Sequence, residues 1–174
     1  SVSFEYDRAV LDKPVGMFVA LQIGAGAVYL ATLFCLRRRP TTRSMVLVIV
    51  ATGLLMRAAQ LAAVPVLEDD FYRYLWDGAV TAHGRSPFAF APQQVRQNTG
   101  DVPAEILRLA EASGPTLDRV NHPELRTIYP PTAQAVFAVA FWISPFDLQG
   151  LRLVWLALDV AILGLLISLL RDSP

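Results

Sequence analysis

The sequence predicts an all-α integral membrane protein with about four transmembrane helices and a large outer loop that contains short helices. Hydrophobic residues make up 54% of the 174 residues, and mean hydropathy is +0.43. This is too apolar for an ordinary soluble domain of this size. Residues 15–36 contain no charged residue, and residues 45–67 contain only Arg57. Each run exceeds the roughly 20 residues that cross a bilayer.

Two further apolar segments are predicted spans. Residues 132–148 form a short segment that contains Pro145. Residues 151–170 are long enough to cross a bilayer, although Asp159 lies near their middle. Residues 68–131 then form one long loop between the second and the third span.

Basic residues in the first connection predict the orientation of the chain. This connection carries Arg37, Arg38, Arg39 and Arg43 and no acidic residue. The positive-inside rule places it in the cytoplasm, so residues 68–131 are expected on the outer face, which is periplasmic in a bacterial inner membrane. The net charge of zero gives no indication of a nucleic-acid partner, and Cys35, as a single cysteine, excludes an internal disulfide.

The start of the outer loop predicts a short helix from Asp69 to about Thr81. Glu68 or Asp69 can cap it, and Gly84 is placed to end it. Helical spacing puts Asp69, Arg73, Trp76 and Val80 on one face and Asp70, Tyr74 and Asp77 on a neighbouring one.

The rest of the loop contains three further signals. Residues 86–92 are aromatic and bounded by prolines, which favours a position in the membrane interface. Residues 102–112 have the pattern of an amphipathic helix that could rest on the membrane surface. Pro130 and Pro131 are tolerated in the first turn of the third span.

Three consecutive carboxylates, Glu68, Asp69 and Asp70, stand where the second span ends. Acidic groups are costly at such a place, so they indicate a function. One aspartate could act as a general base on a substrate hydroxyl. Helix capping is the alternative, with about 0.3–1 kcal/mol for each acid near the helix N-terminus, but capping needs only one acid. A divalent metal site made of Asp69, Asp70 and Asp77 would give a similar pattern.

Other residues of the loop are candidates for substrate contacts. Arg73 and Arg126 could bind phosphate oxygens through a bidentate fork, although a salt bridge or a lipid headgroup is the commoner role of each alone. Tyr72 and Trp76 are typical of interfacial anchors and could also form an aromatic floor for a sugar. His122 could orient an acceptor or a phosphate, whereas a lone loop histidine is more often simply solvated.

Arg57 and Asp159 are the intramembrane polar candidates. Counted from the inner end of each span at about 1.5 Å per residue, both lie near the midplane. An unpaired charge at this depth is expensive, so we expect the two to pair, or Arg57 to face a phosphate in a cavity.

Two sequence motifs resemble the bacterial multispanning glycosyltransferases of the GT-C type. They are EDDFYRYLWDGAVTAHGRSPFAFAP, at residues 68–92, and NHPELRTIYPPTAQAVF, at residues 121–137. The chain is most similar to mannosyltransferase-like members that use polyprenyl-phosphate sugars, and the resemblance covers about residues 12–170. One motif follows a span and the other precedes the next span, in the order of the family.

The resemblance implies an acidic residue of the outer loop as the base on the acceptor, with Asp70 first and Asp69 second. The substrate pocket would be lined by Tyr72, Arg73, Trp76, Asp77, His122, Arg126 and Tyr129. The donor would be a polyprenyl-phosphate-linked sugar, the acceptor a glycan or lipid, and membrane lipid a further partner. The reaction would be displacement at the anomeric carbon, with polyprenyl phosphate leaving. No cofactor is certain, and a divalent metal is possible.

The family has about eight or more spans, so residues 1–174 are expected to be the N-terminal membrane portion of a longer GT-C-like domain. Where the family often has Asn-Pro-Tyr, this chain has Ser86-Pro87-Phe88. Two other classes of function stay open. One is a non-catalytic membrane component whose outer loop docks a partner, and the other is a small transporter whose path is marked by Arg57 and Asp159.

Overall fold

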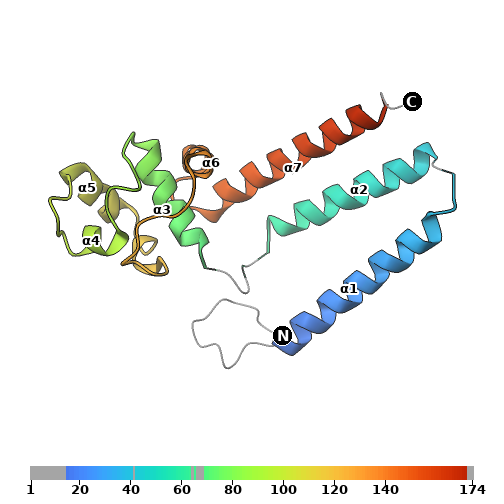
Figure 1. The fold of residues 1–174 in the computed structure, drawn as a ribbon, viewed down its shortest axis with the longest axis horizontal. Helices are drawn as coiled ribbons and strands as arrows, with labels where there is room; N and C mark the ends of the chain where they lie inside the picture. The colour runs from blue at the N-terminus through green and yellow to red at the C-terminus, as the bar shows by residue number, and fades with distance from the viewer. Residues whose placement is uncertain (1–14, 41, 64, 66–68, 172–174) are drawn as a thin grey trace. The chain divides into compact units, whose positions relative to one another are not determined.

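The computed structural model describes residues 15–40, 42–63, 65 and 69–171. These residues form helices joined by turns and loops, and no strand occurs in the described ranges. The chain divides into two compact units, Ser1–Leu67 and Glu68–Pro174 (Figure 1). Three of the described helices are long and apolar enough to cross a membrane, so the chain has the character of a membrane protein.

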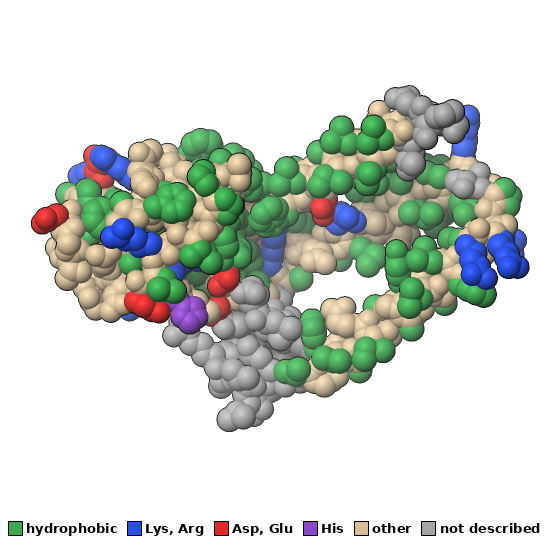
Figure 2. Space-filling model, viewed as in Figure 1, with side chains coloured by type: hydrophobic (Ala, Val, Ile, Leu, Met, Phe, Trp, Pro, Cys, Tyr) green, Lys and Arg blue, Asp and Glu red, His purple; other side chains and the backbone are tan. Residues whose placement is uncertain are grey.

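The first unit contains two of these helices, α1 (Val15–Leu36) and α2 (Arg43–Gln60). Neither helix has a buried residue within the structure, as expected for helices whose apolar side chains meet lipid. Arg37, Arg38 and Arg39 lie in the turn that follows α1, Arg43 begins α2, and all four are exposed. Basic side chains gather at this turn, whereas hydrophobic side chains follow the long helices (Figure 2).

The predicted bounds are confirmed for α1 and corrected for α2. The side chain of Thr42 accepts the Met45 N–H at 3.2 Å, so α2 begins earlier than the predicted residue 45. It ends at Gln60 and not at residue 67. Pro65 has no N–H and disfavours the helical conformation of the residue before it, which explains the early end.

Helix α3 (Phe71–Ala82) is the centre of the second unit. On one side of α3 lie α6 (Pro131–Ile143) and the first turns of α7 (Leu148–Arg171). On the other lie α4 (Pro92–Arg96), α5 (Ala104–Ala112) and a short 3₁₀ helix, Leu117–Arg119 (Figure 1). The predicted helices at 69–81 and 102–112 are therefore present, and Gly84, at φ +70°, follows the end of α3 as expected.

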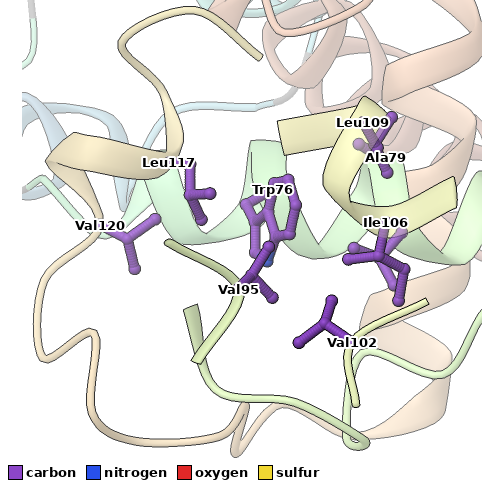
Figure 3. Close-up of a cluster of buried hydrophobic side chains, with 9 residues drawn as sticks. Trp76, Ala79, Val95, Val102, Ile106, Leu109, Leu117 and Val120 are labelled. Atoms are coloured by element: carbon purple, nitrogen blue, oxygen red, sulfur yellow. The ribbon is translucent and has the colours of Figure 1, made fainter. Parts of the chain in front are cut away.

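Two hydrophobic cores hold these layers together. The first is centred on Trp76, and side chains from α5 and the neighbouring segments surround its ring (Figure 3). Its buried members are Trp76, Ala79, Val80, Val95, Val102, Ile106, Leu109, Leu117 and Val120. The second joins α3 to α6 and α7, with Leu75, Phe137, Ala140, Leu151 and Val154. The apolar face of α5 packs in the first core, so it does not face outward as the expected membrane-surface position would require.

Helices α3 and α6 pack closely against each other. Asp77 meets Gln134, and the ring of His83 meets Phe141 at a centroid distance of 5.5 Å. The two backbones approach closely at Gly78, where an added Cβ would lie 2.7 Å from the carbonyl carbon of Phe137. A real Cβ does not tolerate this distance, so glycine is required at this crossing.

The predicted third span, at 132–148, is shorter in the structure. Helix α6 has 13 residues, which corresponds to about 20 Å, less than the roughly 30 Å of hydrocarbon. It ends before Pro145, where Ser144 is extended at φ −150°. Helix α7 begins at Leu148, before the predicted residue 151. Three of the predicted spans are thus long helices, and the fourth stays a prediction.

Candidate functional site

Arg73 fastens the segment 121–129 to α3. Its side chain is buried, with 6% of its surface exposed. One guanidinium nitrogen, Nη1, donates to the carbonyl of Leu125, and Nη2 donates to those of Asn121 and His122, each at 2.9 Å. Arg73 therefore clamps the backbone, a different role from the predicted phosphate contact.

Asp69 is held inside the same junction. Its carboxylate accepts a hydrogen bond from the side-chain amide of Asn121. Only 4% of Asp69 is exposed. A buried carboxylate that accepts from a fixed amide is a poor candidate for a base that must reach a substrate hydroxyl.

Asp70 differs from Asp69 in its exposure and in its partner. It is partly exposed, and the Tyr129 hydroxyl donates to its Oδ2 at 3.0 Å. Asp70 occupies the N-cap position of α3, but its side chain makes no capping hydrogen bond. Its position at the N-terminus of α3 still allows a favourable interaction with the helix dipole, so the capping alternative stays open. The carboxylate is oriented by Tyr129 while part of its surface faces solvent.

Tyr129 is kept in its protonated form by its surroundings. Burial raises the pKa of its hydroxyl, and hydrogen bonds with Tyr74 and Asp70 raise it further. The Tyr74 ring meets the Tyr129 ring edge-on, with centroids 5.0 Å apart. At neutral pH Tyr129 is therefore a hydrogen-bond donor to Asp70.

Asp77 lies in a buried polar cluster with Thr127 and Gln134, and 1% of its surface is exposed. Gln134 donates from Nε2 to the Asp77 carboxylate at 3.2 Å and to the Thr127 hydroxyl at 3.0 Å. The pKa of Asp77 is raised by burial, while the hydrogen bonds from Thr127 and Gln134 and the charge of Arg73 oppose the shift. Asp77 is covered by α6, and its predicted contact with a substrate stays a prediction.

Sequence reasoning missed Thr127 and Gln134. The Gln134 Oε1 atom is buried and has no hydrogen-bond partner among the described residues. A signal was present, because Gln134 is the only side-chain amide in the apolar stretch 131–143. A lone amide within an otherwise apolar helix indicates a polar partner on the neighbouring element.

Asp77→Asn is expected to be close to neutral at pH 7, within about 1 kcal/mol, because an amide of the same shape can keep the hydrogen bonds. The folded-state pKa of Asp77 lies above its unfolded value. As pH rises, the unfolded chain therefore loses this proton first, and the wild-type protein loses stability between the two pKa values. The variant should lack this loss. Melting temperatures in detergent from acidic to neutral pH provide the test, and a variant that melts far below wild type at pH 7 would contradict it.

The other candidate residues divide into covered and exposed groups. Trp76 is 2% exposed and packs in the first core, which does not support its predicted role as an anchor or sugar floor, and that role stays a prediction. The face of α3 that carries it is covered by α5 and the 3₁₀ helix. The Tyr72 hydroxyl accepts a hydrogen bond from Arg119 at 2.8 Å. His122 and Arg126 are exposed, and the His122 Nδ1 lies 3.6 Å from a carboxylate oxygen of Glu124.

The structure does not assemble the alternative metal site. The carboxylates of Asp69, Asp70 and Asp77 have different partners, on Asn121, Tyr129 and Gln134. Within the described ranges no group of three or more His, Cys, Asp or Glu side chains is placed to hold a metal ion.

The two intramembrane candidates belong to different units. Arg57 lies on α2, where its Nη1 donates to the Gly53 carbonyl at 3.2 Å, and Asp159 lies on α7. Their predicted pairing would join the two units and stays a prediction.

No known family model matches this chain, and neither a curated protein nor a solved structure matches it. The arrangement around Asp70 is therefore interpreted from its own contacts.

Proposed function

We propose that this chain carries the acceptor-activating region of a glycosyltransferase of the GT-C type, in a bacterial inner membrane. The enzyme would transfer a sugar from a polyprenyl-phosphate donor to a hydroxyl of a glycan or lipid acceptor on the outer face. The observation that supports this proposal is the pairing of Asp70 with Tyr129, a partly exposed carboxylate oriented by a hydroxyl 3.0 Å away.

Asp70 has the properties of a general base. Its carboxylate would accept the proton of the acceptor hydroxyl as that oxygen attacks the anomeric carbon. The bond from this carbon to the phosphate oxygen breaks, and polyprenyl phosphate leaves with the bonding electrons. A positioned base contributes typically 10²–10⁴-fold to such a step. The hydrogen bond from Tyr129 would fix the orientation of the partly exposed carboxylate.

Positive charge near the leaving phosphate is the second requirement. Arg73 is committed to three backbone carbonyls. Arg126 and His122 are exposed on the same segment, so they are the better candidates for a contact with phosphate. In this proposal Arg73 acts indirectly, by holding the segment that presents them.

The proposal uses the orientation predicted from the arginines between the first two spans, with residues 68–131 outside. The sequence predicted about four crossings, of which α6 would be the shortest. Helix α6 lies along α3, whose Arg73 and Asp77 are charged groups that hydrocarbon does not accommodate. We therefore assign three crossings, with α6 in the outer layer beside α3.

Asp70→Asn in the whole protein is expected to lower sugar transfer from polyprenyl-phosphate hexoses by at least about 10²-fold, because an amide cannot accept the proton. Transfer is measured in isolated membranes with a labelled donor and extracted acceptor. Asp69→Asn should lower it less, since Asn can still bond to Asn121. Asp118→Asn, at an exposed position paired with Arg96, serves as the matched control. Undiminished transfer by a folded Asp70→Asn protein would rule out the proposal and favour a non-catalytic role.

A further inference from the structure

Two large apolar side chains of the clamped segment face away from the protein. Leu125 is 53% exposed. Ile128 is 83% exposed, which is the highest value among the large hydrophobic residues in the described ranges. Arg126, also exposed, lies between them. Leu125, Arg126 and Ile128 thus bring two exposed apolar side chains and one cation together within four consecutive residues.

The segment cannot turn these side chains inward, because its other face is already bonded. Arg73 holds the carbonyl of Leu125, and the buried Thr127 hydroxyl accepts from Gln134. Tyr129 is bonded to Asp70. Thr127 is buried and Tyr129 is half-buried, whereas Leu125, Arg126 and Ile128 are exposed. The exposure of Ile128 is thus built into the fold.

Helix α7 indicates where this edge lies relative to a bilayer. Gly150, Leu151 and Val154 are buried, whereas no side chain from residue 155 to residue 169 is. The apolar window of α7 begins at Leu148, but the turns before Trp155 are packed against protein. Beyond them α7 extends away from α3 and α6 (Figure 1). Residues 155–171 extend about 25 Å as a helix, close to a bilayer thickness.

Trp155 marks the outer boundary of this free part of α7. It is 46% exposed, and tryptophan is enriched at the membrane–water interface. Tyr129 packs against the core that contains Val154, the residue before Trp155. Ile128 precedes Tyr129 in the chain, so it belongs to the same part of the second unit as the packed first turns of α7.

We propose that the edge formed by Leu125, Arg126 and Ile128 docks into the outer lipid–water interface. Ile128 and Leu125 would enter the boundary of the acyl chains, and Arg126 would lie among the lipid phosphates. The occupant is the bilayer surface because the edge belongs to the unit that carries the candidate span α7 and because Arg126 can bind lipid phosphates, while the exposed Glu124 lies 3.6 Å from the His122 Nδ1. This docking does not depend on the proposed transferase activity.

The single cysteine of the chain makes a direct test possible. Cys35→Ser removes the native thiol, and Ile128→Cys then accepts one environment-sensitive nitrobenzoxadiazole label. In liposomes of zwitterionic and anionic phospholipids, the emission of the label should rise about two-fold or more and shift to the blue. A nitroxide on the lipid headgroup should quench it. A label at Leu125→Cys should respond in the same way. Agreement between the two positions would show that the response does not come from a structural disturbance by one substitution.

Asp118→Cys is the matched control, since Asp118 is exposed in the same unit. Its label should stay in water, without quenching by lipid-borne nitroxide. Arg126→Glu should weaken the response of the label at residue 128 in anionic liposomes more than in zwitterionic ones. A label at residue 128 that behaves like the one at residue 118 would overturn the proposal. So would a response that grows with the protein-to-lipid ratio, because that result would indicate contact with a second protein copy.

Discussion

Arg73→Met is expected to lower the free energy of unfolding of the second unit by about 3–5 kcal/mol. Methionine keeps much of the length and the apolar volume of arginine but donates no hydrogen bond. The substitution leaves the carbonyls of Asn121, His122 and Leu125 without their donor. Hydrogen bonds to a charged group contribute roughly 1.5–3 kcal/mol each, and they are not additive when one group makes all of them.

The measurement is the thermal melting midpoint in detergent, which should fall by about 12–20 °C for a loss of this size. Arg126→Met is the matched control, because it removes an exposed arginine from the clamped segment itself. This control should melt within about 0.5 kcal/mol of wild type. Arg73→Lys should be intermediate, since an ammonium keeps the charge but lacks the planar fork. Equal melting of Arg73→Met and wild type would show that the clamp contributes little.

The clamp also links stability to the proposed chemistry. The segment that Arg73 holds carries Tyr129, and Tyr129 orients Asp70. Loss of the clamp should therefore lower transfer even where the protein is still folded. Arg73 would then be a positioning residue, without any contact to the substrate.

The elements that the sequence predicts well are those with local signals. Helix α1 matches its predicted range because nothing within residues 15–36 interrupts an uncharged run. Helices α3 and α5 follow from their periodicity, and Pro131 begins α6 as predicted. In each case the pattern and the stop signal lie within the element itself, so no distant contact is needed to define it.

The roles of individual side chains could not be predicted in the same way, because their partners are far away in the chain. Arg73 bonds to residues 48–52 positions later, and Asp77 bonds to Gln134, 57 positions later. Helical spacing placed Trp76 on a face of α3 but did not show that α5 covers that face. Both faces of α3 are covered by other elements, and a single-helix pattern does not reveal this.

The distinction between the two adjacent aspartates also came from distant contacts. The sequence ranked Asp70 above Asp69 only through a resemblance. The structure adds a physical difference, since Asn121 and burial enclose Asp69 whereas Tyr129 orients a partly exposed Asp70. This difference supports the choice of Asp70 as the proposed base. The transfer assay on Asp70→Asn tests whether it acts as one.

Gly78→Ala is expected to force α3 and α6 apart and to destabilise the second unit by about 1–3 kcal/mol. The added methyl group would overlap the carbonyl oxygen of Phe137 and lie 2.7 Å from its carbonyl carbon. These are backbone atoms of a neighbouring helix, so no side-chain rotation relieves the overlap. Alanine favours a helix over glycine by only about 1 kcal/mol, too little to offset a shift of two packed helices.

Gly164→Ala provides the matched control, because this glycine lies within α7 and an added Cβ would meet nothing within 4 Å. That variant should melt at or slightly above the wild-type temperature. Gly78→Ala should melt several degrees lower than wild type. It should also reduce transfer, because the interface between α3 and α6 includes the Asp77–Gln134 contact and lies next to the Asp70–Tyr129 pair. If both variants melted alike, the close approach of α3 and α6 would not be a determinant of stability. The orientation of Asp70 by residues near the start of α6 would then need another explanation.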